Sequence, residues 1–339
     1  MAVLSFVLRL ADLGSRLRGN DVHEASSPRR RGPNFGARIR RSLSLPVMAL
    51  ALATTAHATT THEIKPEPVQ GYRYQIVTTD DSAITRRIVD DITRRLVPVF
   101  AVFRTELAQH RRMLYVTVGP AALREVAQRR CDCVVISTFT SSQVVRSILG
   151  TLPAARAASF TAVYAEPAPA DQLRLVALLY RRPVRVAAIL GPDTAFLKPL
   201  LEGEHVSVLE ADPDEDINRL LNQIGQTDVL LALPDSAVYN TENFRNILLS
   251  TYRHKQGVIG FSADMVKAGA LATTYSEVED INAQVAEIVA SYVAGGELAA
   301  PQFPRYFHTI VNEGVARSLD VEVPDNVRNF ARPMPAHQP

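Results

Sequence analysis

Short apolar runs alternate with longer amphipathic stretches along most of the chain after Gly71. Eight runs have the length and bulk of buried strands: Tyr72–Thr78, Met113–Val118, Cys133–Ser137, Thr161–Tyr164, Val184–Leu190, Val206–Leu209, Val229–Leu233 and Val258–Phe261. Between them lie helical patterns, and in Val278–Val293 the apolar residues recur every three or four positions, as on one face of a helix. Strand–helix alternation predicts βαβ units and parallel sheets, so the expected fold class is α/β.

The chain is too long for one small domain, since its 339 residues can bury more than one core. The Pro-rich segment Ala165–Asp171 divides the expected strands into two groups. Pro-rich segments of this kind are typical of the links between compact units. We therefore expect two Rossmann-like lobes, with a first crossing between them at Ala165–Asp171.

The basic charge of the chain is concentrated in a leader. Residues 1–58 hold nine of the 37 basic and three of the 35 acidic residues, so the remainder is net acidic at −4. This balance gives no indication of a nucleic-acid partner. Arg38, Arg40 and Arg41 precede the apolar run Leu43–Ala53, which ends shortly before an Ala-His-Ala motif at residues 56–58. The pattern predicts a signal peptide cut after Ala58 and a periplasmic location. The apolar run is shorter than the ~20 residues that span a bilayer, so no membrane anchor is expected.

The two cysteines, Cys131 and Cys133, are too few for a structural zinc site, which needs four ligands. A disulfide across one residue would be strained. The favoured interpretation is a pair of small buried strand residues, because a free cysteine behaves as a small hydrophobe. Pairing in an exported protein stays open.

Catalytic and metal-binding motifs are absent from the sequence. It has no Gly-rich phosphate loop, no G-x-S-x-G motif and no H-E-x-x-H pair, and its eight histidines are scattered singly. The acidic cluster Asp212–Asp216 lacks the glycine and the final glutamate of a calcium loop. It is better interpreted as a helix start with Asp212 as N-cap. We therefore expect no enzyme activity, no metal and no cofactor.

Small polar and aromatic residues gather where the expected strands end. The candidate ligand-binding residues are Ser137, Thr138, Thr140, Tyr164, Glu166, Asp235, Tyr239, Phe261 and Ser262. Ligands of open parallel sheets bind beyond the carboxyl ends of the strands, where these residues would lie. Several have structural alternatives: Asp235 is also a good helix N-cap, and Tyr164 and Phe261 are also good core aromatics.

The second half of the chain contains five characteristic sequence segments in this order: Asp228–Asn240, Gly257–Ser262, Ala268–Ser276, Pro304–Asn312 and Ala316–Pro324. In this order they resemble the ABC-transporter substrate-binding protein family with the type I periplasmic binding fold, and within it a proteobacterial branch. The resemblance covers residues 171–324. Between Ser137 and Gln172 the chain is shorter than commoner members and lacks the Pro-Ile-Val-Phe and Asp-Pro-Val segments that help to line their ligand cleft.

The resemblance implies how the chain is divided. A leader at 1–58 would precede lobe 1 at 67–166, lobe 2 at 167–270, a return to lobe 1 at 271–300 and a return to lobe 2 at 301–330. The lobes would be joined by a hinge with three crossings and would close on a ligand. A family aspartate maps onto Asp235, and a Gly-Phe-Ser-like turn maps onto Phe261 and Ser262.

The implied function is capture of a small molecule in the periplasm for delivery to an ABC importer. The partners would be this small-molecule ligand and an ABC permease, and the chain would be a monomer. An alternative function of the same fold is a stand-alone ligand-sensing or scaffold protein without a transporter. The resemblance does not indicate which ligand is bound.

Overall fold

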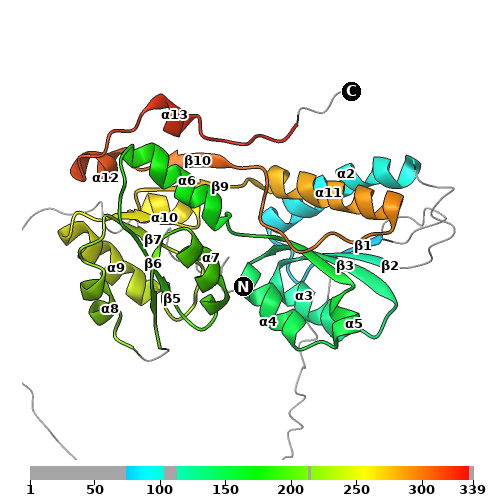
Figure 1. The fold of residues 1–339 in the computed structure, drawn as a ribbon. Helices are drawn as coiled ribbons and strands as arrows, with labels where there is room; N and C mark the ends of the chain where they lie inside the picture. Colours follow the sequence, from blue (N-terminus) through cyan, green and yellow to red (C-terminus); the bar gives the residue numbers. More distant parts are fainter. Residues whose placement is uncertain (1–73, 103–112, 213–214, 336–339) are drawn as a thin grey trace, which may run out of the picture.

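The computed structural model describes residues 74–102, 113–212 and 215–335. The leader expected at residues 1–58 and its cleavage site lie outside the described residues. The chain forms two α/β lobes that lie side by side and are joined by segments running along one edge (Figure 1). The predicted α/β class and two-lobe architecture are confirmed.

Lobe 1 contains a parallel sheet with the strand order β1-β2-β3-β4. Its strands are β1 (Tyr74–Val77), β2 (Met113–Val118), β3 (Cys133–Thr140) and β4 (Phe160–Tyr164). Helices α2 (Ala83–Val102) and α11 (Val278–Gly295) cover one face of the sheet, and they pack around Leu114 and Ile136. Helices α3 (Gly119–Gln128) and α4 (Ser142–Gly150) cover the other face around Val135, and the short α5 (Ala154–Ala157) precedes β4.

Lobe 2 contains a sheet with the strand order β10-β9-β8-β7-β5-β6. Its strands are β5 (Val186–Leu190), β6 (Ser207–Glu210), β7 (Val229–Leu231), β8 (Gly257–Ile259), β9 (Ala272–Tyr275) and β10 (His308–Val311). All neighbours are parallel except β9 and β10, which pair antiparallel. The expected parallel sheet is therefore confirmed, with one antiparallel pair at this edge, where the chain enters β10 from lobe 1.

Helices cover both faces of the second sheet. Helices α8 (Ile217–Gln223), α9 (Thr241–Arg253) and α10 (Ala263–Ala268) pack against one face. The other face carries α6 (Pro169–Tyr180), the 3-10 turn η2 (Ala195–Leu197), α7 (Lys198–Gly203), α12 (Glu313–Ser318) and α13 (Asp325–Arg328). The two helical layers leave the strand ends and their loops as the exposed edges of the lobe.

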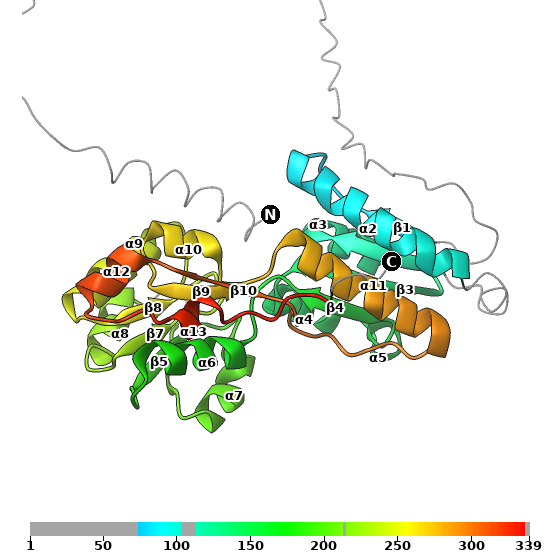
Figure 2. The same ribbon diagram turned by 90° about the horizontal axis from the view of Figure 1, so that it is seen from above.

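The chain crosses between the lobes after β4, after β9 and after α11 (Figure 2). Strand β9 belongs to the second sheet, so lobe 2 extends to Tyr275 rather than to residue 270. Gln302 still bridges Val163 of β4, so the third crossing begins later than residue 301. After α13 the chain turns back toward lobe 1, where the sulfur of Met334 lies 3.9 Å from the Arg95 guanidinium on α2.

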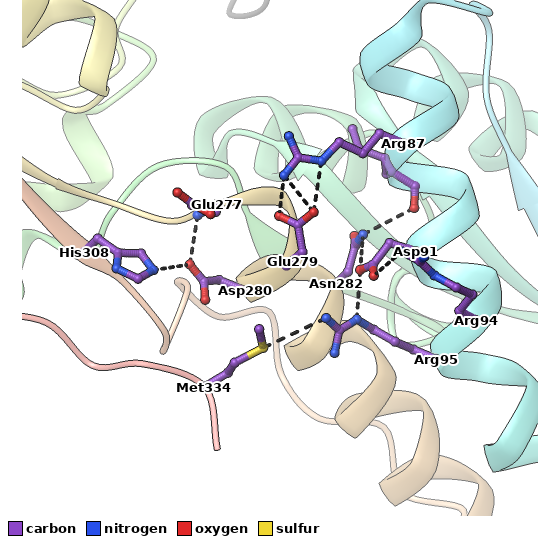
Figure 3. A network of polar contacts seen from close by, with 11 residues as sticks. Arg87, Asp91, Arg94, Arg95, Glu277, Glu279, Asp280, Asn282, His308 and Met334 are labelled. Carbon is purple, nitrogen blue, oxygen red and sulfur yellow. Dashed lines mark hydrogen bonds and ion pairs between the residues drawn. The ribbon is translucent and has the colours of Figure 1, made fainter. Parts of the chain in front are cut away.

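The crossings are tied to α11 by polar contacts (Figure 3). Asp280 accepts a hydrogen bond from the backbone N–H of Glu277 at 2.9 Å and lies 3.1 Å from Nε2 of His308 in lobe 2. Asn282 donates to Asp91 of α2 at 3.0 Å, which joins the two helices of lobe 1. One buried residue, Gln284, accepts from the backbone N–H of Arg305 at 2.7 Å. The second and third crossings are therefore anchored to one helix.

Two local predictions from the sequence are wrong. Helix α8 begins at Ile217, and its N-cap is Asp216, whose carboxylate accepts from the backbone N–H of Asn218 at 2.9 Å. Asp212 precedes this helix by too many residues to cap it. Cys131 and Cys133 form a disulfide rather than two free thiols. A bend of the backbone at Asp132, just before β3, holds their Cα atoms 5.3 Å apart, within the usual range for a disulfide.

Candidate functional site

The edge of lobe 1 that could bind a ligand lies at the end of β3. The pairing of β3 with β4 shifts between Thr138 and Thr140, and the intervening Phe139 has a φ of 54°, in the left-handed region. Such bulges redirect a strand and are frequent beside functional sites. Ser137 and Thr138 are buried, and within the described residues their hydroxyl oxygens have no hydrogen-bond partner. The bulge leads the chain directly into α4.

Glu166 lies in the first crossing, at the N-terminus of α4. Its Oε1 accepts a hydrogen bond from the backbone N–H of Ser142 at 2.9 Å. Its Oε2 is buried and has no partner in the described part of the chain, as is true of Ser141 Oγ and Gln143 Oε1. Burial raises the pKa of Glu166, although the hydrogen bonds from Ser142 oppose the rise. A buried carboxylate oxygen is thus left free to accept a hydrogen bond.

Tyr164 ends β4 beside this carboxylate. Its ring lies edge-on to Phe303 of the third crossing, with 5.0 Å between ring centroids. Burial raises the pKa of Tyr164, the negative charge of Glu166 adds to the rise, and the positive charge of Arg146 opposes it. The structure therefore brings Tyr164 and Glu166 together with the end of β3, and their contact with a ligand stays a prediction.

Asp235 follows β7 in lobe 2 and is almost fully buried. Its Oδ2 accepts from the backbone N–H of Thr194 at 3.1 Å and from the Thr194 hydroxyl at 2.9 Å. Its Oδ1 accepts from the backbone N–H of Ala237 at 3.0 Å. Gly191 lets the carboxylate approach, since a Cβ at this position would lie 2.2 Å from Oδ1. Asp235 therefore joins the loops that follow β5 and β7.

The exposed polar pair at the same edge is Ser236 and Asp193. The Ser236 hydroxyl donates to Oδ2 of Asp193 at 2.6 Å. These two side chains project from the loops that Asp235 holds together. They are the groups of this edge that solvent or a ligand can reach.

The other residues predicted in lobe 2 lie behind this edge. Tyr239 and Phe261 are buried in the apolar core between the sheet and α8–α10, with their rings edge-to-face at 5.9 Å. Burial raises the pKa of Tyr239. Ser262 caps α10, because its Oγ accepts from the backbone N–H of Met265 at 3.3 Å. These contacts give the three residues packing and capping roles, and their contact with a ligand stays a prediction.

One contact that the sequence did not predict joins the two edges. The Arg146 guanidinium of α4 lies over the ring of Phe196 in η2, with 4.2 Å between Cζ and the ring centroid. Arg146 is exposed and Phe196 is half-buried. Arg146 belongs to lobe 1 and Phe196 to lobe 2, so no local sequence pattern could predict their contact. Helix α4 of lobe 1 and the turn η2 of lobe 2 are therefore in contact across the gap between the lobes.

A separate apolar pocket of about 600 Å³ lies on the outside of lobe 2. It is lined by α9, α10 and α12, including Phe244, Leu248 and Val315. Its lining comes from lobe 2 alone, so it does not belong to the region between the lobes. Within residues 74–102, 113–212 and 215–335, no group of His, Cys, Asp and Glu side chains could hold a metal ion. The same residues include no helix long and apolar enough to cross a membrane.

No family model matches the sequence, and no curated protein matches it. Solved structures match the fold. A substrate-binding protein with adhesive properties from Clostridium difficile, in its ligand-free open form, aligns with a TM-score of 0.50 at 14% identity. The alignment covers 76% of this chain and 96% of that one.

Two further structures are similar at lower scores. A Streptococcus pneumonia structure described as an ABC domain in complex with L-Trp has a TM-score of 0.47 at 15% identity, covering 77% of this chain and 97% of that one. A conserved domain protein from Vibrio cholerae has a TM-score of 0.45 at 18% identity, covering 68% of this chain and 81% of that one. The proteobacterial branch named by the resemblance stays a prediction. At the level of the fold the resemblance is confirmed, and the chain has the two-lobed architecture of type I periplasmic binding proteins.

Proposed function

We propose that this protein captures a small polar molecule between its two lobes. The observation that carries the proposal is the free oxygen of Glu166, which is buried at the N-terminus of α4 and has no partner in the described residues. A buried polar atom without a hydrogen bond costs about 1–3 kcal/mol, and more when it is charged. A ligand that donates a hydrogen bond to Glu166 would remove this cost. The ligand would then supply the hydrogen bond that the buried carboxylate oxygen lacks.

The neighbouring groups define the chemistry of the ligand. Glu166 Oε2 would accept a hydrogen bond from an amine or a hydroxyl, and the hydroxyl of Ser141 would add a second polar contact. Arg146 would leave the ring of Phe196 and pair with an anionic or strongly polar group of the ligand. From lobe 2, Ser236 and Asp193 would complete the enclosure once the lobes close. The ligand class proposed is a small molecule with a donor at one end and an acceptor at the other.

Capture in the periplasm for an ABC importer is the broader role proposed, supported by the signal-peptide pattern that ends at Ala58 and by the fold. The alternative is a stand-alone ligand-sensing or scaffold protein without a transporter, and the many hydrogen bonds of the hinge favour a scaffold role. In particular, Gln284 and Asp280 hold the second and third crossings against α11. A hinge that bends must absorb its rotation in the few residues between these anchors. Adjacent genes for a permease and an ATPase would favour import over this alternative.

The experiment that tests capture is mass spectrometry of small molecules released by denaturing the purified protein. One compound should be released in a fixed ratio to the wild-type protein. The Glu166→Gln variant keeps an acceptor for Ser142 but loses the charge, and it should release at least about tenfold less. Glu125→Gln makes the same change on α3, where the carboxylate pairs with Arg129, and this matched control should release the wild-type amount. Equal release from all three proteins would refute the role given to Glu166.

A further inference from the structure

The disulfide of lobe 1 lies at the opposite end of the sheet from the proposed ligand site. Cys131 precedes β3 and Cys133 begins it, whereas Ser137 and Glu166 belong to the other end. Cys131 is half-buried, and Cys133 is only 1% exposed. Cys131 is therefore the more exposed residue of the pair.

Arg156 of α5 is placed against both sulfur atoms. One of its terminal nitrogens lies 3.4 Å from Cys131 Sγ and 3.3 Å from Cys133 Sγ. The other donates to the backbone carbonyl of Cys133 at 3.2 Å. The guanidinium also stacks over Phe160, with 4.7 Å from Cζ to the ring centroid. Burial lowers the pKa of Arg156, while the charge of Asp132 opposes the fall, and guanidinium groups stay protonated in proteins.

This arrangement is poorly explained as a structural staple. A disulfide stabilises a protein mainly by closing a loop in the unfolded chain, and the benefit grows with loop length. Here the loop contains the single residue Asp132, so the benefit is near its minimum. A neighbouring cation also stabilises a neutral disulfide only slightly. It stabilises a thiolate much more, because positive charge lowers the pKa of a cysteine thiol.

We propose that Cys131 and Cys133 form a redox-active pair that exchanges electrons with an external thiol. An external thiolate attacks Cys131 Sγ, the sulfur of the more exposed cysteine. The Sγ–Sγ bond breaks, a mixed disulfide forms on Cys131, and Cys133 leaves as a thiolate held by Arg156. A second external thiolate then attacks the external sulfur of the mixed disulfide and releases Cys131 as a thiolate. The protein disulfide gains two electrons, and two external thiols are oxidised to one disulfide.

The charged and titratable groups around the two cysteines determine how stable the thiolates of the reduced pair are. Arg156 of α5 favours the thiolates, and Asp132 in the loop disfavours them. Tyr115 of β2 interacts with Arg156, and the Arg129 guanidinium lies over the Tyr115 ring at 5.2 Å. The backbone carbonyl of Arg129 lies 4.0 Å from Cys131 Sγ. Arg156 is thus a positioning and charge-stabilising residue, and Arg129 is its natural control.

The test uses the purified oxidised protein and reduced glutathione. Samples are quenched with acid, alkylated and mapped by mass spectrometry. The pair should be reduced, with transient glutathione attached to Cys131 and not to Cys133. Arg156→Gln should slow reduction about three- to tenfold, because the leaving thiolate loses its cation. Arg156→Lys should retain most of the rate, and Arg129→Gln should match the wild type.

A pH profile separates this role from a purely structural one. In the reduced wild type, the rate of alkylation should follow a thiol pKa below the usual ~8.5. Arg156→Gln should raise that pKa and Asp132→Asn should lower it, and melting curves should show that each variant is folded. The proposal is wrong if the disulfide resists excess glutathione. It is also wrong if folded Arg156→Gln has the rate and pH profile of the wild type.

Discussion

Arg146 of one lobe lies over the ring of Phe196 of the other, with 4.2 Å between the guanidinium carbon and the ring centroid. The contact joins helix α4, which follows β3, to the turn η2, which follows β5, without involving any of the three crossings. It therefore reports directly on whether the lobes are close together. A ligand that binds there must displace or complete this contact.

Removing Arg146 should open the lobes without unfolding them. An exposed cation–π contact contributes about 0.5–1 kcal/mol, so Arg146→Ala should raise the ratio of open to closed molecules roughly two- to fivefold. Double spin labels placed on α4 and α7 would measure the distance distribution. Arg94→Ala removes an exposed arginine from α2 and should leave the distribution unchanged. A distribution in Arg146→Ala identical to wild type would show that the contact does not hold the lobes.

Asp235 should prove a stabilising residue of lobe 2. Its carboxylate accepts hydrogen bonds from Thr194 and Ala237, and an asparagine amide would place N–H donors against at least one of them. Asp235→Asn should lower the free energy of unfolding by about 1–3 kcal/mol. Denaturant unfolding measures this change, and Ser236→Ala, which loses only an exposed hydrogen bond to Asp193, is the control. A variant as stable as wild type would contradict the bonding described.

Gly191 gives an independent check on the same contact. A methyl group at Gly191 would lie 2.2 Å from Asp235 Oδ1, so Gly191→Ala must push the carboxylate aside and should cost roughly 1–3 kcal/mol. A methyl group at Gly203, at the end of α7, would meet no other atom within 4 Å. Gly203→Ala should be neutral or stabilising by roughly 0.5–1 kcal/mol. Equal effects of the two changes in thermal unfolding would argue against the close approach.

The buried carboxylate of Glu166 should make stability depend on pH. Its pKa in the folded protein lies above that of an unfolded glutamate, about 4.3, because burial disfavours the charged form. Its contribution to stability is therefore complete below pH ~4 and is lost as the pH rises through the folded pKa. The unfolding free energy of wild type should fall relative to Glu166→Gln between pH 4 and pH 8. A difference that stays constant over this range would show that the carboxyl is not perturbed.

The strands that the sequence located all contain at least two adjacent apolar residues. Strand β7 is fully buried and reads Val-Leu-Leu, as expected for a central parallel strand. Strand β9 was missed because two of its four residues are threonines. Thr273 and Thr274 are satisfied inside the protein by Gln172 of α6, which lies about a hundred positions earlier. Strand β9 therefore lacks the continuous apolar pattern by which a buried strand is predicted from sequence.

The candidate site was predictable only in part, for the same reason. The candidate residues lie in the last part of β3 and at or just after the end of β4, so their position at one edge could be deduced from strand order. The partner of Asp235 could not, because Thr194 is 41 positions away and is fixed by the loop after β5. Arg146 and Phe196 contact each other only because the two lobes lie together in the folded protein. The oxygen of Glu166 lacks a partner only because folding buries it, and neither feature has a local sequence pattern.

Closure of the lobes around a bound molecule is the central claim, and small-angle X-ray scattering tests it most directly. The compound released from the protein is added back at saturating concentration, and the radius of gyration is compared with that of the ligand-free protein. Closure predicts a smaller radius in the wild type and no decrease in Glu166→Gln at the same concentration. An unchanged radius in saturated wild-type protein would contradict closure and identify the molecule as a rigid sensor or scaffold.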